Sequence, residues 1–200
     1  MSYCKFRHMI KQIAMKSWEG LSDNIWHGSE ERLFRSIRDD QIIVPTDDDD
    51  WFSPHLRNHL LNRSEDVLIW KSFCHQTFLS HKLESRWNKN LGSNEYAIRG
   101  SVFKRLSFAN KIHILHAHGS VKNLTRGSSC NTTKLFMSCY NWHVGSASVL
   151  SSVTPNRIGK IIPDLKSDFP FLDNYPWLIW YFKMFCDVVK SIKRQPIKML

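Results

Sequence analysis

The stretch IIVPTDDDDWFSPHL, residues 42–56, constrains the fold of this chain more than any other feature. Four adjacent aspartates follow an apolar, β-branched segment and come directly before two aromatic residues. Neighbouring carboxylates repel one another and favour the unfolded chain unless positive charge lies among them. The run is therefore either a hydrated surface loop or a set of ligands for a cation.

The residues on both sides place the aspartates on a turn between a strand and a helix. Residues 41–44 predict a short buried strand, because β-branched side chains fill it and Pro45 stops it. Ser53 and Pro54 predict the start of a helix. The apolar face of that helix is expected to contain Leu56, Leu60 and Leu61. Ligands of open α/β sheets bind beyond the carboxyl ends of strands, so this position favours a cation.

The rest of the chain alternates between strand-like and helix-like segments. A capping Ser29 and the acids after it predict a helix whose buried stripe is Leu33, Phe34 and Ile37. Strands are expected at residues 67–70, 95–99 and 112–118, a short helix at 102–108 and a mobile polar loop at 120–133. The first sixteen residues do not resemble a buried strand. The alternation predicts an α/β fold with a mixed sheet.

The size and charge of the chain limit its organisation and its partners. A length of 200 residues with 42% hydrophobic content predicts one packed domain, residues 1–174, followed by an amphipathic helix over residues 175–200. The net charge of +10 is uneven, since residues 1–50 hold 7 Lys/Arg against 10 Asp/Glu and residues 51–200 hold 21 against 8. A basic body predicts an anionic partner, namely a nucleotide, a nucleic acid or a membrane lipid.

The cysteines and the apolar segments predict the compartment. The five cysteines are odd in number and form no CxxC pair, which indicates free thiols in a reducing, cytoplasmic environment. The first residues contain no apolar run typical of a signal peptide, and no segment is apolar over 18 residues. We therefore expect a cytoplasmic protein without a membrane span.

The segment PTDDDDWFSP resembles the metal-binding motif of GT-A glycosyltransferases, in the form found in rhamnosyltransferase-like proteins. The segments SNEYAIRG, residues 93–100, and YNWHVGSASVL, residues 140–150, resemble later parts of the same family. The resemblance implies a GT-A-like mixed sheet flanked by helices. It also implies Mn²⁺ or Mg²⁺ bridging the phosphates of a nucleotide-sugar donor, and a glycan or lipid-linked acceptor.

The resemblance also implies a role for each acidic residue. Asp48 and Asp50 correspond to metal ligands, Asp47 and Asp49 to residues that contact the ribose or orient their neighbours, and His143 to a ligand of the metal or a phosphate. A cation at this point would stabilise the negative charge of the nucleoside diphosphate as it leaves the sugar.

Two other side chains near SNEYAIRG fit either a functional or a structural role. Glu95 is the acid of that segment and would be the general base of an inverting transfer, or else an exposed carboxylate. Arg99, with Lys104 and Arg105, would bind phosphate or line a solvated helix face. The family has a longer segment before the metal motif, so the chain is expected to be shortened, to pair with another polypeptide, or to be inactive.

Three further patterns have two interpretations each. His116 and His118 would share one face of a strand, as a metal pair or as structural residues, and the latter is favoured. Cys74, His75 and His81 lack the spacing of a zinc site, which favours a buried thiol beside a surface histidine. The helix from residue 176 combines aromatic residues with a basic end, so it fits either a helix on anionic lipid or one docked on the core.

The main alternative function is a non-catalytic basic protein that binds a membrane surface or a nucleic acid. Nucleic acid is disfavoured, because modules that bind it interleave basic residues with aromatic platforms, whereas the aromatic residues here gather beside the aspartates and near the C-terminus. The sequence identifies neither the sugar, nor the acceptor, nor the stereochemistry of transfer.

Overall fold

The structure is a computed structural model that describes residues 3–21, 30–76, 82–86, 91–117, 121–142 and 174–194. Six strands are described: β1 Ile42–Ile43, β2 Trp51–Phe52, β3 Val67–Gln76, β4 Lys82–Arg86, β5 Tyr96–Arg99 and β6 Cys130–Trp142. The α-helices are α1 Tyr3–Trp18, α2 Glu30–Ser36, α3 Leu56–Leu61, α4 Gly100–Arg105, α5 Phe108–Ala117, α6 Val121–Leu124 and α9 Pro176–Arg194. A 3₁₀ turn, η1 Ser93–Glu95, precedes β5.

The strands form one mixed sheet with the order β1-β5-β3-β6-β2, and β4 pairs with the second half of β3. Strands β3 and β6 run parallel from Val67↔Cys130 to Gln76↔Trp142, whereas the other pairs are antiparallel. The prediction of an α/β fold with a mixed sheet flanked by helices is confirmed.

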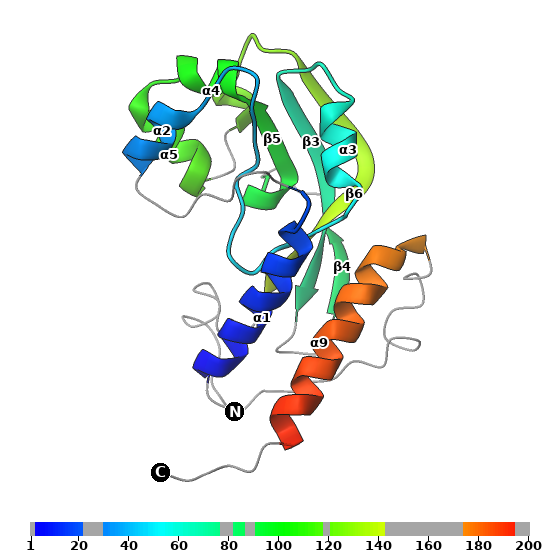
Figure 1. Cartoon of the computed structure of the whole chain (residues 1–200). Helices are drawn as coiled ribbons and strands as arrows, with labels where there is room; N and C mark the ends of the chain where they lie inside the picture. Colours follow the sequence, from blue (N-terminus) through cyan, green and yellow to red (C-terminus); the bar gives the residue numbers. More distant parts are fainter. Residues whose placement is uncertain are drawn as a thin grey trace.

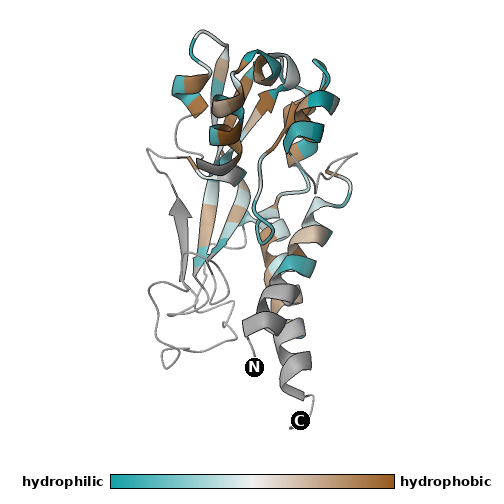
Figure 2. Ribbon diagram, turned by 90° about the vertical axis from the view of Figure 1, so that its left-hand side faces the viewer, coloured by the Kyte–Doolittle hydropathy of each residue, from teal (hydrophilic) through white to brown (hydrophobic). Residues whose placement is uncertain are grey.

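Helices pack against the sheet (Figure 1). Two separate hydrophobic clusters lie between the helices and the sheet. The first joins α1, α3 and α9 to the sheet and contains large buried side chains such as Trp51, Trp70 and Phe182. The second joins α4, α5 and α6, with residues of α2, to the other part of the sheet through Tyr96 and Ile98. Individual helices combine hydrophobic and hydrophilic residues, as expected for helices with one side on a sheet (Figure 2).

The connection between β1 and β2 crosses the whole sheet. Strand β1 pairs with β5 at one edge, and β2 pairs with β6 at the opposite edge. Residues 44–50, which include all four aspartates, therefore pass from one edge to the other. The aspartates follow the carboxyl end of β1, as the sequence predicts, but they lead into strand β2, which the sequence analysis does not predict.

Side chains from two helices satisfy the outer edge of β2. Ser17 of α1 accepts a hydrogen bond from the backbone N–H of Phe52 at 3.2 Å. The hydroxyl of Tyr181 in α9 donates to the carbonyl of Phe52 at 3.0 Å. An unpaired edge strand invites association with other strands, and these two bonds remove that opportunity at β2.

Several predicted elements are confirmed, and others are wrong. The helix after Ser29, the strands at β1 and β5, the short helix α4 and the C-terminal helix are present. Residues 112–118 were expected to form a strand but lie in α5 up to Ala117, because a short apolar run does not distinguish a strand from a helix. The mobile loop expected at 120–133 instead contains α6 and the start of β6. Leu61, expected on an apolar face, is 60% exposed, and α3 begins at Leu56 rather than at Pro54.

Helix α9 is docked on the core along its described first half. Leu178, Phe182 and Phe185 are fully buried, so the apolar face of this part of the helix contacts protein. This arrangement agrees with the core-docked alternative, and it leaves lipid contact at the basic end as a prediction. Within the described residues, no helix is both long and apolar enough to cross a membrane.

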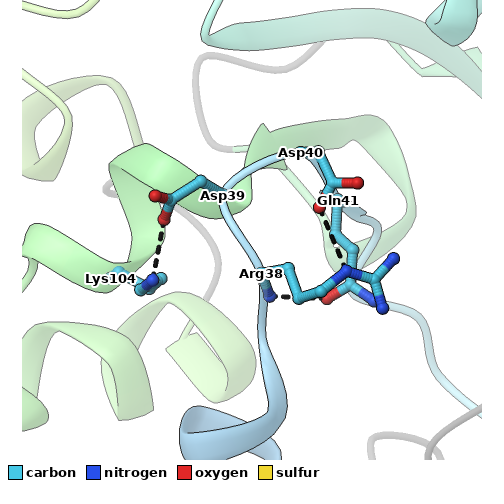
Figure 3. A network of polar contacts seen from close by, with 5 residues as sticks. All are labelled: Arg38, Asp39, Asp40, Gln41 and Lys104. Carbon is cyan, nitrogen blue, oxygen red and sulfur yellow. Dashed lines mark hydrogen bonds and ion pairs between the residues drawn. The ribbon is translucent and has the colours of Figure 1, made fainter.

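The start of β1 is fixed to the start of α4 by a close backbone contact. Gly100 donates its N–H to the carbonyl of Gln41 at 2.8 Å, and a Cβ at Gly100 would lie 1.9 Å from the carbonyl oxygen of Arg38. Ion pairs surround this contact, since Asp39 binds Lys104 at 2.8 Å and Asp40 binds Arg38 at 3.2 Å (Figure 3). The glycine of SNEYAIRG is therefore required for packing.

Replacing Gly100 with alanine is expected to destabilise the protein by about 1–3 kcal/mol, the usual cost of overpacking at a site that cannot yield easily. Urea denaturation measures this change in the free energy of unfolding. Ser101→Ala, one position along the same helix, is the control and should change it by less than about 0.5 kcal/mol. Equal stabilities of Gly100→Ala and the control would contradict the close approach.

The hydroxyl of Tyr181 predicts a loss of stability at alkaline pH. Burial raises the pKa of Tyr181 to about 12, above the ordinary value of 10.0. The folded state therefore favours the neutral phenol, and this contribution is complete below about pH 10 and is lost as the pH rises towards 12. The free energy of unfolding should fall more steeply above about pH 10 in the wild type than in Tyr181→Phe. Parallel pH profiles of the two proteins in urea titrations would refute this assignment.

Candidate functional site

The backbone of residues 47–50, here called the acidic turn, is held by side chains from two other elements. The indole Nε1 of Trp18 in α1 donates to the carbonyl of Asp50 at 3.0 Å. The amide of Asn141 in β6 donates to the carbonyl of Asp49 at 2.7 Å. Both bonds are buried, so the turn is fixed in place at its second half.

The four carboxylates differ in exposure. Asp50 is completely buried and Asp49 is 8% exposed, whereas Asp47 is exposed and Asp48 is half-exposed. Asp50 accepts a hydrogen bond from the backbone N–H of Asp47 at 3.3 Å, which closes the turn on itself. Asp47 and Asp48 are therefore the carboxylates that solvent and a ligand reach most directly.

A cation from the protein already lies beside the acidic turn. The ammonium of Lys11 in α1 is 3.3 Å from Asp48, and both side chains are about two-fifths exposed. This pair offsets part of the repulsion that four adjacent aspartates create. The sequence analysis does not identify Lys11, because nothing in the sequence near residue 11 indicates that α1 meets residue 48.

Buried polar groups lie behind the acidic turn. His75 is fully buried, and its Nδ1 is 3.2 Å from the Oδ1 of Asn141, the residue that binds the turn. Burial raises the pKa of the Cys139 thiol well above its ordinary value, and the negative charges of Cys74 and Asp50 add to the effect. Asp50 thus acts on the interior of the protein rather than on solvent.

The expectation for Cys74 and His75 is wrong. The sequence analysis favours a buried thiol and a surface histidine, whereas Cys74 is half-exposed and His75 is buried. Trp51, Phe182 and Phe185 surround the imidazole of His75. The reason is that β3 continues to Gln76, so alternate residues of a longer strand point to the core. His81 lies outside the described residues.

Segment SNEYAIRG joins three strands through buried hydrogen bonds. The carbonyl of Asn94 accepts hydrogen bonds from Nε1 of Trp70 at 2.8 Å and from the hydroxyl of Ser138 at 2.7 Å. Glu95 is 2% exposed, and its carboxylate accepts bonds from the hydroxyl of Ser72 at 2.5 Å and from the backbone N–H of Gly92. These contacts give Glu95 a structural role, and its role as a general base stays a prediction.

Arg99 and Lys104 lie apart from the acidic turn. Arg99 is paired with Ile42 at the beginning of β1, whereas the aspartates follow the end of β1. Its guanidinium donates to the carbonyls of Glu65, at 3.1 Å, and of Arg63. Lys104 binds Asp39 beside the same end of the strand. The structure does not bring these basic side chains to the carboxylates.

The residues described by the structure contain no complete metal site. Among them, no group of three or more His, Cys, Asp and Glu is arranged to hold a metal ion. His143 and most of the segment after it lie outside the described residues, as does His118. Divalent magnesium is commonly held by one or two carboxylates and the phosphates of a substrate, and the accessible pair Asp47 and Asp48 fits that limited role.

Asn141→Ala is expected to destabilise the protein by about 1–3 kcal/mol, because it leaves the buried carbonyl of Asp49 without its donor. Thermal and urea denaturation measure the loss. Asn131→Ala is the matched control, since it removes an asparagine amide of the same strand that binds the half-exposed Glu65. A larger loss in the control than in Asn141→Ala would contradict the anchoring of the acidic turn.

Comparisons with known proteins add no relative: no family model, no curated protein and no solved structure matches this chain significantly.

Proposed function

We propose that the chain is a GT-A-like glycosyltransferase domain that depends on Mn²⁺ or Mg²⁺. It would transfer a sugar from a nucleotide-sugar donor to a glycan or a lipid-linked acceptor. The proposal rests on the resemblance of PTDDDDWFSP to the metal motif of that family and on the geometry of the acidic turn.

The observation that carries the proposal is that the backbone of the acidic turn is fixed while two of its carboxylates remain exposed to solvent. Trp18 and Asn141 hold the carbonyls of Asp50 and Asp49, while Asp47 and Asp48 remain accessible to a ligand. A hydrated loop would need no buried anchors at its carbonyls. A preorganised site is typical of groups that must meet a ligand with little rearrangement.

The residues of the acidic turn would have different roles according to their exposure. Asp47 and Asp48 would hold the cation together with the donor phosphates, and the bound cation would stabilise the negative charge of the leaving diphosphate. Lys11, which lies at 3.3 Å from Asp48, would offset carboxylate charge before the donor binds. The family role of Asp50 in metal binding stays a prediction, because its carboxylate is buried.

Calorimetry with Mn²⁺, alone and with UDP, GDP or dTDP, tests the proposal. Metal should bind weakly alone and more tightly with a nucleoside diphosphate, because phosphates complete its coordination. The double variant Asp47→Asn/Asp48→Asn should weaken the metal-dependent binding of the diphosphate about tenfold or more, which is about 1.4 kcal/mol.

The matched control is Asp39→Asn/Asp40→Asn, which neutralises two adjacent aspartates on the turn before β1 (Figure 3). The control should bind metal and diphosphate as the wild type does. Equal binding by both double variants would exclude a metal site at the acidic turn. Binding of diphosphate without any dependence on metal would support the alternative of a basic binding protein.

A further inference from the structure

Helices α1 and α9 lie antiparallel, and a side chain from each of them binds the backbone of the same residue of β2. Ser17 of α1 binds the N–H of Phe52, and Tyr181 of α9 binds its carbonyl. The part of α1 before Ser17 and the part of α9 after Tyr181 extend away from Phe52 in the same direction. The beginning of α1 and the end of α9 therefore extend to the same pole of the molecule (Figure 1).

The sequence concentrates positive charge at that pole. The first half of α1 has basic residues and the whole helix has no acidic one. The second half of α9 has basic residues, and Asp187 is the acid of that helix. The set, here called the basic pole, consists of Lys5, Arg7, Lys190, Lys193 and Arg194.

This charge opposes the usual electrostatics of a helix. The N-terminus of a helix is the positive end of its dipole and favours acidic side chains, yet α1 begins with Lys5 and Arg7. The basic residues at the end of α9 suit their own dipole, but their charge adds to that of the neighbouring helix start. An anionic surface would relieve the repulsion at both helix ends.

The composition of the two segments favours a bilayer as that surface. Apolar residues alternate with the basic ones, since Phe6, Met9 and Ile10 follow in α1 and Val188, Val189 and Ile192 in α9. A mixture of basic and apolar residues is typical of helices at lipid headgroups. We infer that the basic pole binds anionic phospholipid, with both helices contributing to the contact.

The mode of binding differs from a helix lying with its apolar face in the membrane. Leu178, Phe182 and Phe185 contact the core and are not accessible to lipid. The pole therefore binds mainly through charge, and its affinity must fall with salt and with the fraction of anionic lipid. This inference does not depend on the proposed transferase activity.

Vesicle sedimentation tests the inference with the full chain. The wild type should bind vesicles of phosphatidylcholine with phosphatidylserine and should be released by salt, and it should not bind phosphatidylcholine alone. The variants Lys5→Gln/Arg7→Gln and Lys190→Gln/Lys193→Gln should each weaken binding about 25-fold, since each basic residue contributes about fivefold. Lys122→Gln/Arg126→Gln, at exposed positions in and after α6, is the control of equal charge.

Each result of the sedimentation experiment supports or overturns the inference that the basic pole binds anionic lipid. Loss of binding in both pole variants with little change in the control would support it. Equal weakening by all three double variants, or salt-insensitive binding, would overturn it, as would retention on single-stranded nucleic acid without binding to anionic vesicles. If a double variant does not fold, as judged by circular dichroism, the single variants Lys5→Gln and Lys190→Gln take its place, each expected to weaken binding about fivefold relative to the single control Lys122→Gln.

Discussion

The hydrogen bonds from Trp18 and Asn141 to the acidic turn hold together parts of the structure that are far apart in sequence. Residues 44–50 cross from one edge of the sheet to the other, so their placement decides whether β2 can pair with β6. Trp18 brings α1 to that crossing, and Asn141 belongs to the strand that β2 joins. Loss of either bond would leave a buried carbonyl unsatisfied and release the edge strand that both terminal helices cover.

Four adjacent aspartates are tolerated here because the fold separates their environments. Asp50 is turned into the protein and accepts the N–H of Asp47, while Asp48 meets the ammonium of Lys11. The exposed member, Asp47, also contributes to raising the pKa of the Tyr96 phenol, after burial as the main cause. The ammonium of Lys11 and the N–H of Asp47 thus offset part of the repulsion expected from the sequence alone.

The sequence predicts the elements whose structure depends on neighbouring residues. It does not predict those whose structure depends on contacts with residues far away in the chain. The turn after β1, the strand β5 and the helix from Pro176 follow from β-branched runs, a stopping proline and an apolar face. Strand β2 has only Trp51 and Phe52, and it is a strand because β6 pairs with it. The partner of Asp48 and the structural role of Glu95 likewise depend on contacts that no local pattern encodes.

Helix α1 connects the two charged regions to which we assign functions. Its last turn supplies Trp18 to the acidic turn, and its first turns carry Lys5 and Arg7 of the basic pole. The 13 residue-to-residue steps from Lys5 to Trp18 correspond to at most about 20 Å along a helix axis. A bilayer at the basic pole would therefore lie within about 20 Å of Trp18, the residue that binds the acidic turn. For the proposed transferase, this geometry would favour a lipid-linked acceptor over a soluble one, because one contact would bring the protein and the acceptor to the same surface.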